Sequence, residues 1–160
     1  MAIRNLRYEG DEILRKKSRE IEVIDDRIKE LAEDMFDTMH KYDGLGLAGV
    51  QVGILKRIIV IDLYDDVSKF CLINPEIVEK SEETVELEEG CLSYPNQFGK
   101  VVRSTKVKVK ALDLDGKNVT LEAEGLLAQA LQHEIDHLNG EVFKDKILPG
   151  TFEIITPQEN

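Results

Sequence analysis

The chain has 160 residues, of which 42% are hydrophobic and 33% are charged, and its formal net charge is −11 at pH 7. This composition is typical of a folded protein, and the length fits a single domain over residues 1–160. The acidic charge excludes direct binding to nucleic acid, because binding to phosphates needs a basic surface. No apolar run reaches the length of a membrane span, and the N-terminal residues lack the apolar core of a secretory signal. We therefore expect a cytoplasmic protein with no nucleic-acid or membrane partner.

The first part of the chain predicts one short helical turn and one long helix. Residues Asp11–Arg15 suit a single turn. Between Asp26 and Tyr42, apolar residues recur at steps of three and four, as on one face of an amphipathic helix. Either Asp25 or Asp26 can cap the start of this helix, and Gly44 follows its end. The apolar stripe consists of Ile28, Leu31, Ala32, Met35, Phe36 and Met39.

A glycine-rich segment and two apolar runs come next. Residues Gly44–Gly53 include four glycines and have no helical period, so we expect a special loop or the approach to a strand. Residues Arg57–Leu63 and Phe70–Ile73 are rich in β-branched and apolar side chains, which predicts two strands.

The middle of the chain predicts two pairs of antiparallel strands. Residues 76–80 and 84–89 alternate in polarity and are expected to pair through a turn at Ser81–Glu83. Residues Thr105–Leu114 alternate strictly, and the dipeptide Asp115-Gly116 is a hairpin signal before the returning strand NVTLEAE.

A second helix is predicted from Gly125 to Asn139, because this segment contains no proline and Gly140 stands directly after it. The residues beyond Gly140 suggest a short strand and a polar tail. Helices and strand runs are separated along the chain, so the predicted fold class is α+β.

The second predicted helix carries the segment HEIDH, in which His137 follows His133 by four positions. This spacing places both imidazoles on one helix face, where they can bind the same metal ion. Glu134 lies beside His133 and can reach a metal-bound water without being a ligand, as a general base must. The alternative is a solvent-exposed helix whose two histidines have this spacing by coincidence.

A catalytic metal site needs a third protein ligand and one open position. The candidates are His40, Cys71 and Cys91. His40 stands in the last turn of the first helix, where an interaction with the helix dipole explains it, and Cys71 in an apolar strand is expected to be a buried small hydrophobic residue. Cys91 differs, because it follows Glu89-Gly90 at the end of an alternating strand, where glycine permits a close approach of the backbone. We therefore expect Cys91 to complete the metal site.

Three separated segments together resemble the motifs of the peptide deformylase family. They are GLGLAGVQ (Gly44–Gln51), EGCLS (Glu89–Ser93) and QHEIDHLNG (Gln132–Gly140), and their order and spacing also match. The resemblance covers nearly all of the chain. It implies a single catalytic domain in which antiparallel strands pack around a central helix that carries HEIDH. It also implies removal of the formyl group from the N-terminal formyl-methionine of newly made proteins, so the expected partners are N-formyl-methionyl nascent peptides.

The resemblance implies the same three metal ligands, Cys91, His133 and His137, and one divalent ion between them. This ion is expected to be Fe²⁺ in the cell, with Zn²⁺ or Ni²⁺ as substitutes. By resemblance, Glu134 is the general acid and base. The side-chain amide of Gln51 and the backbone N–H of Leu92 donate to the formyl oxygen, which makes an oxyanion hole assisted by the metal.

Further residues are expected to contact the substrate. Gly44 and Gly46 can let a peptide backbone pass close to the protein, for instance as an added strand. The methionine side chain needs an apolar pocket, for which Leu45, Leu126 and Ala130 are candidates together with Gly46 and His133. A phosphate-binding loop is the alternative for the glycine-rich segment, but that segment lacks the Gly-Lys-Ser/Thr ending of such loops.

The chain departs from the family pattern in two places. The family usually has two alanines where this chain has Ala48-Gly49, a change that we expect activity to survive. Many bacterial members continue into a long basic helix, whereas residues 141–160 contain only Lys144 and Lys146 as basic residues, so we do not expect ribosome docking through this tail. Three more charged residues fit equally well as residues that orient the site and as surface ion pairs: Glu89, Arg103 and Asp136.

Two other functions remain as alternatives. A zinc endopeptidase shares the helical motif, but its third ligand is usually a downstream Glu or His, and no histidine follows His137. A structural metal-binding module would have four closed protein ligands, and no fourth ligand is evident.

Overall fold

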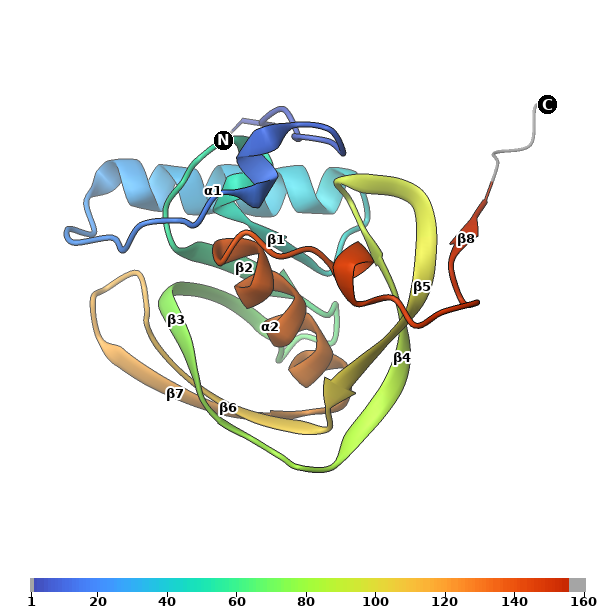
Figure 1. Ribbon diagram of the computed structural model, residues 1–160. Coiled ribbons are helices and arrows are strands. Elements are labelled where there is room, and N and C mark those ends of the chain that lie inside the picture. The colour runs from blue at the N-terminus through green and yellow to red at the C-terminus, as the bar shows by residue number, and fades with distance from the viewer. Residues whose placement is uncertain (1, 156–160) are drawn as a thin grey trace.

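The computed structural model describes residues 2–155. These residues form two α-helices, α1 (Asp26–Lys41) and α2 (Gly125–Leu138), and three 3₁₀ turns, η1 (Glu12–Arg15), η2 (Gly49–Val52) and η3 (Phe143–Lys146). The strands, shown in Figure 1, are β1 (Gly46–Ala48), β2 (Ile58–Asp62), β3 (Lys69–Lys80), β4 (Thr84–Cys91), β5 (Tyr94–Ser104), β6 (Lys106–Leu112), β7 (Asn118–Glu124) and β8 (Glu153–Ile154).

The strands form two antiparallel sheets. The larger sheet has five strands in the order β1-β2-β3-β6-β7, and the smaller sheet has three strands in the order β4-β5-β8. Every pair of neighbouring strands is antiparallel. Helix α2 lies between the two sheets (Figure 1). This arrangement confirms the predicted α+β fold class.

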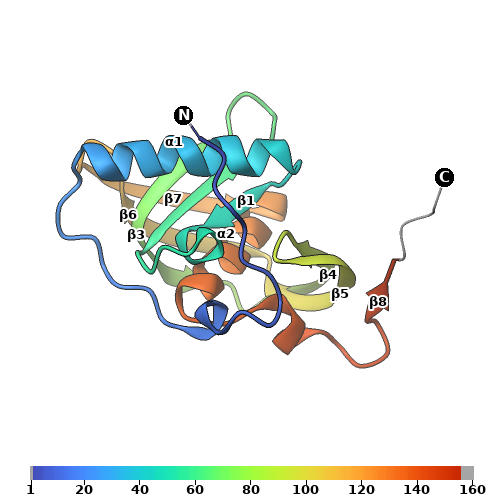
Figure 2. The same cartoon turned by 90° about the horizontal axis from the view of Figure 1, so that it is seen from above.

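The larger sheet carries a helix on each of its faces (Figure 2). Strand β2 is buried on both faces, and its side chains alternate between the two helices. Ile58 and Val60 pack with the apolar stripe of α1, whereas Ile59 and Ile61 pack with apolar residues of α2. Because sequence alternation puts every second residue on the same face, one apolar strand holds both helices in place.

Most elements expected from the sequence are present. Helix α1 begins after Asp25, whose carboxylate accepts a hydrogen bond of 3.1 Å from the N–H of Ile28. The predicted hairpin is formed by β6 and β7, with Leu112 opposite Asn118 and with Gly116 at a φ of +79°. The glycine-rich segment contains β1 followed directly by η2.

One predicted strand pair is wrong. Within the described residues, β3 pairs with β6 (Glu79↔Lys108) and β4 pairs with β5 (Leu87↔Val101), so β3 and β4 do not form a hairpin. The segment at Ser81 instead carries the chain from one sheet to the other. The expected turn, Ser-Glu-Glu, has no residue that favours the left-handed conformation of a tight hairpin, which is why the chain crosses over rather than turning back.

Two further differences concern strand limits. The runs at 70–73 and 76–80 form the single strand β3, with an irregularity at Asn74-Pro75 where Asn74 has a φ of +52°. The sequence pattern does not predict β5, because Pro95, Asn96 and Gly99 interrupt its alternation.

The C-terminal part contains η3 and then β8, which pairs with β5 through Gln97 and Ile154. This pairing confirms the short strand predicted beyond Gly140. The end of the predicted polar tail, residues 156–160, lies outside the described residues. None of the helices in residues 2–155 is long and apolar enough to cross a lipid bilayer.

Candidate metal centre and catalytic cleft

Helix α2 holds the HEIDH side chains in a buried environment. His133, Glu134 and His137 are all buried, and His137 is fully enclosed. The two imidazole rings meet edge to face with centroids 5.1 Å apart. Gln132 anchors the helix to β5, because its side-chain amide exchanges hydrogen bonds of 3.0 and 3.1 Å with the backbone of Ser104. Both imidazoles therefore have fixed positions one turn apart.

Cys91, the last residue of β4, meets these imidazoles. The candidate ligand atoms of Cys91, His133 and His137 lie within 4.8 Å of one another, and Cys91 Sγ is 3.3 Å from His137 Nε2. In a tetrahedral site, bonds of about 2.1 Å to nitrogen and about 2.3 Å to sulfur place ligand atoms about 3.3–3.6 Å apart. The group therefore fits one divalent ion. No other Cys, His, Asp or Glu among residues 2–155 belongs to it, so one coordination position remains for water or substrate.

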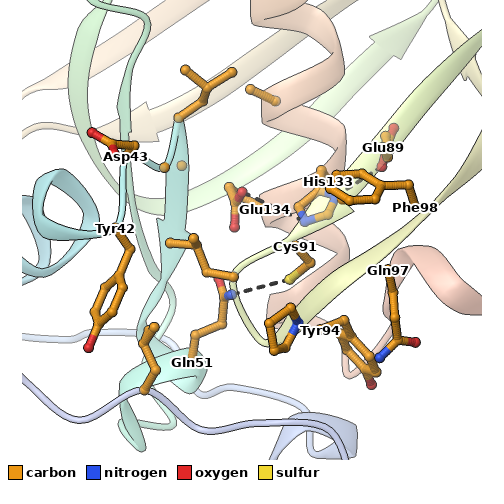
Figure 3. A pocket seen from close by; sticks show the side chains of 18 of the residues that line it. Tyr42, Asp43, Gln51, Glu89, Cys91, Tyr94, Gln97, Phe98, His133 and Glu134 are labelled. Atoms are coloured by element: carbon orange, nitrogen blue, oxygen red, sulfur yellow. Dashed lines mark hydrogen bonds and ion pairs between the residues drawn. The ribbon is translucent and has the colours of Figure 1, made fainter. Parts of the chain in front are cut away.

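A buried network of charges orients His133, and Figure 3 shows Glu89, the member that lies beside the ring. His133 Nδ1 lies 2.8 Å from Glu89 Oε1, which leaves Nε2 to face the metal position. Arg103 donates two hydrogen bonds of 2.7 Å to the Glu89 carboxylate and one of 2.7 Å to Asp136, and Lys146 donates to Asp136 at 3.0 Å. Glu89 and Arg103 are 5% and 4% exposed, so this is an interior network that fixes a ligand, and a surface ion pair is excluded.

The charges of this network shift several pKa values. Burial alone would raise the pKa of Glu89, but the hydrogen bonds from Arg103 and His133 hold it at about 2. Burial lowers the pKa of His137, and the charge of His133 lowers it further, which favours the neutral ring that a metal needs. Burial lowers the pKa of His133, but the charge of Glu134 and the hydrogen bonds to Cys91 and Glu89 raise it well above its usual value. A cation at Nε2 would replace the proton that this environment attracts.

Glu134 projects into the cleft beside the metal position (Figure 3). Its Oε2 lies 3.9 Å from His133 Nε2, and its Oε1 is buried without a hydrogen-bond partner among the described residues. Burial raises the pKa of Glu134 to about 7, although the charge of His133 opposes the shift. A carboxyl group that titrates near neutral pH and has an unpaired oxygen is suited to exchange protons with a water molecule.

Gln51, in η2, points its side-chain amide at Cys91 (Figure 3). Its Oε1 accepts a hydrogen bond of 2.9 Å from the N–H of Ala48, which fixes the orientation of the amide. Its Nε2 donates to Ser93 Oγ at 3.1 Å and to Cys91 Sγ at 3.4 Å. The amide therefore presents hydrogen-bond donors at the metal position. Leu92 directly follows Cys91, in the two-residue turn between β4 and β5.

The glycines of the first motif make room for the site. A Cβ atom added at Gly46 would lie 2.6 Å from Glu134 Oε2, and one added at Gly44 would lie 2.7 Å from Leu92 Cδ1. Any side chain at position 46 would therefore push Glu134 away from its position. Among the described residues, strand β1 pairs with β2 alone and is the edge of the larger sheet.

Gly49 is the position where the resemblance to the peptide deformylase motifs leads us to expect alanine. A Cβ atom added here would lie 3.0 Å from the carbonyl oxygens of Ile54 and Lys56 and 3.0 Å from Ile58 Cγ2. An alanine would therefore require the surrounding backbone to shift, and glycine suits the backbone that this chain adopts at the start of η2.

Most of the candidate site residues line a single cleft with a volume of about 810 Å³. Leu45, Leu126 and Ala130 contribute apolar surface, and Leu45 and Leu126 are partly exposed at 38% and 49%. His137 is buried and does not line the cleft. Ten other candidate site residues line it: Gly44, Leu45, Gly46, Gln51, Cys91, Leu92, Leu126, Ala130, His133 and Glu134.

The two rejected ligand candidates lie elsewhere. His40, in the last turn of α1, has its Nε2 2.8 Å from Asp62 Oδ2. Cys71 lies in β3, and burial raises the pKa of its thiol to about 12, which disfavours the thiolate that a metal binds. Neither residue belongs to the group around Cys91.

Several residues at the site were not predicted from the sequence, among them Ser93, Phe98 and Phe143. Ser93 holds the amide of Gln51, and its place in the EGCLS segment beside a candidate ligand was the available signal. Phe98 lines the cleft. The ring of Phe143 lies 6.1 Å from that of His133, centroid to centroid. Nothing in the local sequence around either phenylalanine points to the site, because both come from segments outside the motifs.

Fold and site together define a class of protein. The site has the parts of a metal-dependent hydrolase. These are a candidate metal group of three ligands with an open position, a carboxyl group beside it and amide donors in the same cleft.

Comparison with known proteins identifies the family. The sequence model of the polypeptide deformylase family matches residues 3–152. Peptide deformylase 1 from Clostridium perfringens (strain 13 / Type A) is 57% identical over 145 residues, which cover 91% of this chain and 98% of that protein. The crystal structure of peptide deformylase from Thermotoga maritima superposes with a TM-score of 0.90 at 42% identity and covers 93% of this chain and 100% of that chain. A peptide deformylase structure from Legionella pneumophila has a TM-score of 0.88 at 48% identity, with coverages of 92% and 88%.

The chain therefore belongs to the peptide deformylase family, whose members are hydrolases that remove the N-terminal formyl group from nascent proteins. Family membership and the group formed by Cys91, His133 and His137 support a bound metal ion.

Proposed function

We propose that this protein removes formate from N-formyl-methionyl peptides at the cleft between β1 and α2, with Cys91, His133 and His137 as metal ligands. The observation that carries the proposal is the meeting of these three donor atoms within 4.8 Å, beside a buried carboxyl group with a free oxygen. An endopeptidase of the same helical motif usually takes its third ligand from a downstream Glu or His. Here the third donor is a cysteine from a strand that precedes the helix.

Glu134 is the proton carrier in this proposal. A divalent ion held by the three ligands supplies a Lewis acid that lowers the pKa of a water molecule and polarises the formyl carbonyl. Glu134 accepts a proton from the attacking water as the water oxygen bonds to the formyl carbon. The carbon–nitrogen bond then breaks, and Glu134 returns the proton to the departing amine. The products are formate and a peptide with a free N-terminus.

Gln51 and Leu92 stabilise the negative charge that develops on the formyl oxygen. The N–H of Ala48 donates to Oε1 of Gln51 and so fixes the amide, and Nε2 of Gln51, which already points at the Cys91 ligand atom, can donate to the substrate oxygen. The backbone N–H of Leu92 is the second donor. Donors held in place before the reaction need no reorganisation during it, which is the physical basis of an oxyanion hole.

Residues on both sides of the cleft hold the substrate. The carbonyl carbon of a formyl group carries a hydrogen atom where other acyl groups carry a carbon chain. Crowded metal ligands therefore admit the formyl group and reject larger acyl groups. The methionine side chain packs against Leu45, Leu126 and Ala130, which supply apolar surface in the cleft. The peptide backbone runs past Gly44 and Gly46, along the free edge of β1, as an added strand.

The metal in the cell is proposed to be Fe²⁺, with Zn²⁺ and Ni²⁺ as substitutes. Iron beside a thiolate is open to oxidation of both partners. Protein purified without oxygen should therefore lose activity after peroxide treatment, and protein reconstituted with Ni²⁺ should lose less. Equal and full activity of the anaerobic protein before and after peroxide would contradict iron.

The setting follows from the same features. We infer one catalytic domain over residues 1–160 that works in the cytoplasm, and the two free cysteines suit a reducing compartment. The described part of the C-terminal segment does not favour ribosome docking. Its two lysines already form ion pairs, Lys144 with Glu9 at 2.7 Å and Lys146 with Asp136 at 3.0 Å.

The proposal is tested by incubating the anaerobic, metal-loaded protein with a formyl-methionyl tripeptide and with the same tripeptide without the formyl group. We expect stoichiometric formate from the first peptide and no change in the second. Cleavage of internal peptide bonds without release of formate would establish the endopeptidase instead.

A further inference from the structure

The outer side of the Gly44–Gly46 segment is held by a residue from a different part of the chain. Tyr64, in the loop after β2, donates a hydrogen bond of 2.8 Å from its hydroxyl group to the carbonyl oxygen of Gly44. On the inner side, the segment has no free space, since an added Cβ at Gly46 would meet Glu134. The segment is thus fixed from both sides, by Tyr64 outside and by the site residues inside.

Tyr64 is itself held in place by the end of β2 and by α1. Its backbone has a φ of +59°, which is uncommon for a residue with a bulky side chain. Its N–H donates to Asp62 Oδ1 at 2.8 Å, while Asp62 Oδ2 lies 2.8 Å from His40 Nε2. The rings of His40 and Tyr64 are 5.6 Å apart, centroid to centroid. Strained backbone that persists in a folded protein is held by its surroundings and points to a role.

Strand β1 is short and lies at the edge of the larger sheet. β1 has three residues, and within residues 2–155 its one neighbouring strand is β2. The N–H of Asp62 donates to the carbonyl oxygen of Leu45 at 3.0 Å, so Asp62 supports this segment directly as well as through Tyr64. A tyrosine hydroxyl group is protonated at neutral pH and can donate, and partial burial and the charge of Asp62 raise the pKa of Tyr64 further in the same direction.

We propose that Tyr64 is a positioning residue, itself supported by the His40–Asp62 pair. It holds the Gly44–Gly46 segment in the position that the substrate backbone needs in order to bind along it. This inference rests on the proposed function, because it assigns the edge to peptide binding. Tyr64 touches no reacting atom. Its effect passes through the carbonyl group of Gly44 to the part of the substrate that binds along β1.

The first test is Tyr64→Phe, which keeps the ring beside His40 and removes only the hydroxyl group. Val67→Ala is the matched control, since it lies in the same loop with its side chain 78% exposed. Steady-state deformylation should show a KM increased about 2- to 10-fold in Tyr64→Phe, the range expected for one neutral hydrogen bond. The kcat and the bound metal per chain should stay at the wild-type values, because contacts equal in ground and transition state affect KM alone.

A second measurement does not depend on activity. Amide hydrogen exchange of residues 44–48 should be faster in Tyr64→Phe than in the wild type, and unchanged in Val67→Ala. If the wild type released no formate, the proposed function would fail, while hydrogen exchange would still decide whether Tyr64 holds the edge. Wild-type exchange and KM in Tyr64→Phe would overturn the inference, as would equal changes in Val67→Ala.

The role of Asp62 is tested in the same two assays. Asp62→Ala removes the acceptor for both Tyr64 and His40, whereas Asp62→Asn keeps an acceptor oxygen for the N–H of Tyr64. We expect a raised KM and faster exchange in Asp62→Ala and at least partial recovery in Asp62→Asn. Because the residues act as a unit, the double variant Tyr64→Phe/Asp62→Ala should be close to the more affected single variant. Fully additive effects would overturn the network.

Discussion

The two walls of the cleft are built in opposite ways. The wall made by α2, β4 and β5 is held by buried charges, with His133, Glu89 and Arg103 joined by hydrogen bonds of 2.7 to 2.8 Å. The wall made by β1 and η2 contains no charged side chain between Gly44 and Val52. Its shape depends on glycines, whose missing side chains leave space for the residues of the site.

This difference predicts two kinds of failure. Removing a group from the charged wall takes away a ligand or leaves a buried charge without its partner, so metal affinity and stability should fall. Adding a group to the glycine wall displaces catalytic atoms by fractions of an ångström, so turnover should fall while the metal remains bound.

The two cysteines give the largest expected contrast on the charged wall. Cys91→Ala should lose nearly all bound metal and nearly all activity, because two imidazoles alone hold a divalent ion weakly. Cys71→Ala is the matched control and should keep both, since Cys71 lies in β3 away from the ligand group. Metal analysis and formate release are measured on both variants. Full metal content in Cys91→Ala would show that the cysteine is only a strand residue.

Arg103 gives the next largest effect, this time on stability. Arg103→Ala leaves the buried carboxylate of Glu89 without its two arginine bonds, and should lower the free energy of unfolding by about 3–5 kcal/mol. Lys106→Ala is the control, because Lys106 pairs with Glu124 at 3.9 Å with both side chains more than 70% exposed, and it should have no measurable effect. Denaturant unfolding checks both. Similar stability losses in the two variants would contradict the role of the buried network.

Gly46→Ala tests the glycine wall. The added methyl group would lie 2.6 Å from Glu134 Oε2, so Glu134 must move, and turnover should fall between about 10- and 100-fold with the metal retained. The effect should nearly vanish when Gly46→Ala is added to Glu134→Ala, since the displaced group is already absent. Turnover numbers of the two single variants and the double variant supply the measurement. An equal fold-loss in both backgrounds would mean that Gly46 acts by another route.

The ligands of the charged wall were predictable from sequence, but the network behind them was not. A helix fixes the geometry of residues four apart, so the spacing of His133 and His137 alone places two ligands on one face. Arg103 and Glu89 lie on the paired strands β5 and β4, and Asp136, 33 positions after Arg103, reaches Arg103 only because β5 packs against α2. Without that packing, an interior network and a surface ion pair are equally compatible with their residue types.

The same contrast holds for the fold. The β6–β7 hairpin was predictable, because strict alternation and an Asp-Gly turn are local signals. The pairing of β4 with β5 was not predictable, because Pro95 and Asn96 interrupt the strand pattern of β5 and the turn at Leu92–Ser93 has no glycine. Its position is set by tertiary contacts such as the bonds between Ser104 and Gln132. The strand that carries the third metal ligand thus depends on long-range packing.

The central claim is that three residues hold the metal and a fourth moves the proton, and Glu134→Ala tests this division most directly. Bound metal per chain and formate release from a formyl-methionyl peptide are measured on the same anaerobic preparation, beside the wild type. We predict about one metal ion per chain and a turnover lower by about 100-fold or more, the usual contribution of a positioned acid and base. Near-normal turnover, or loss of the metal together with the activity, would contradict the account.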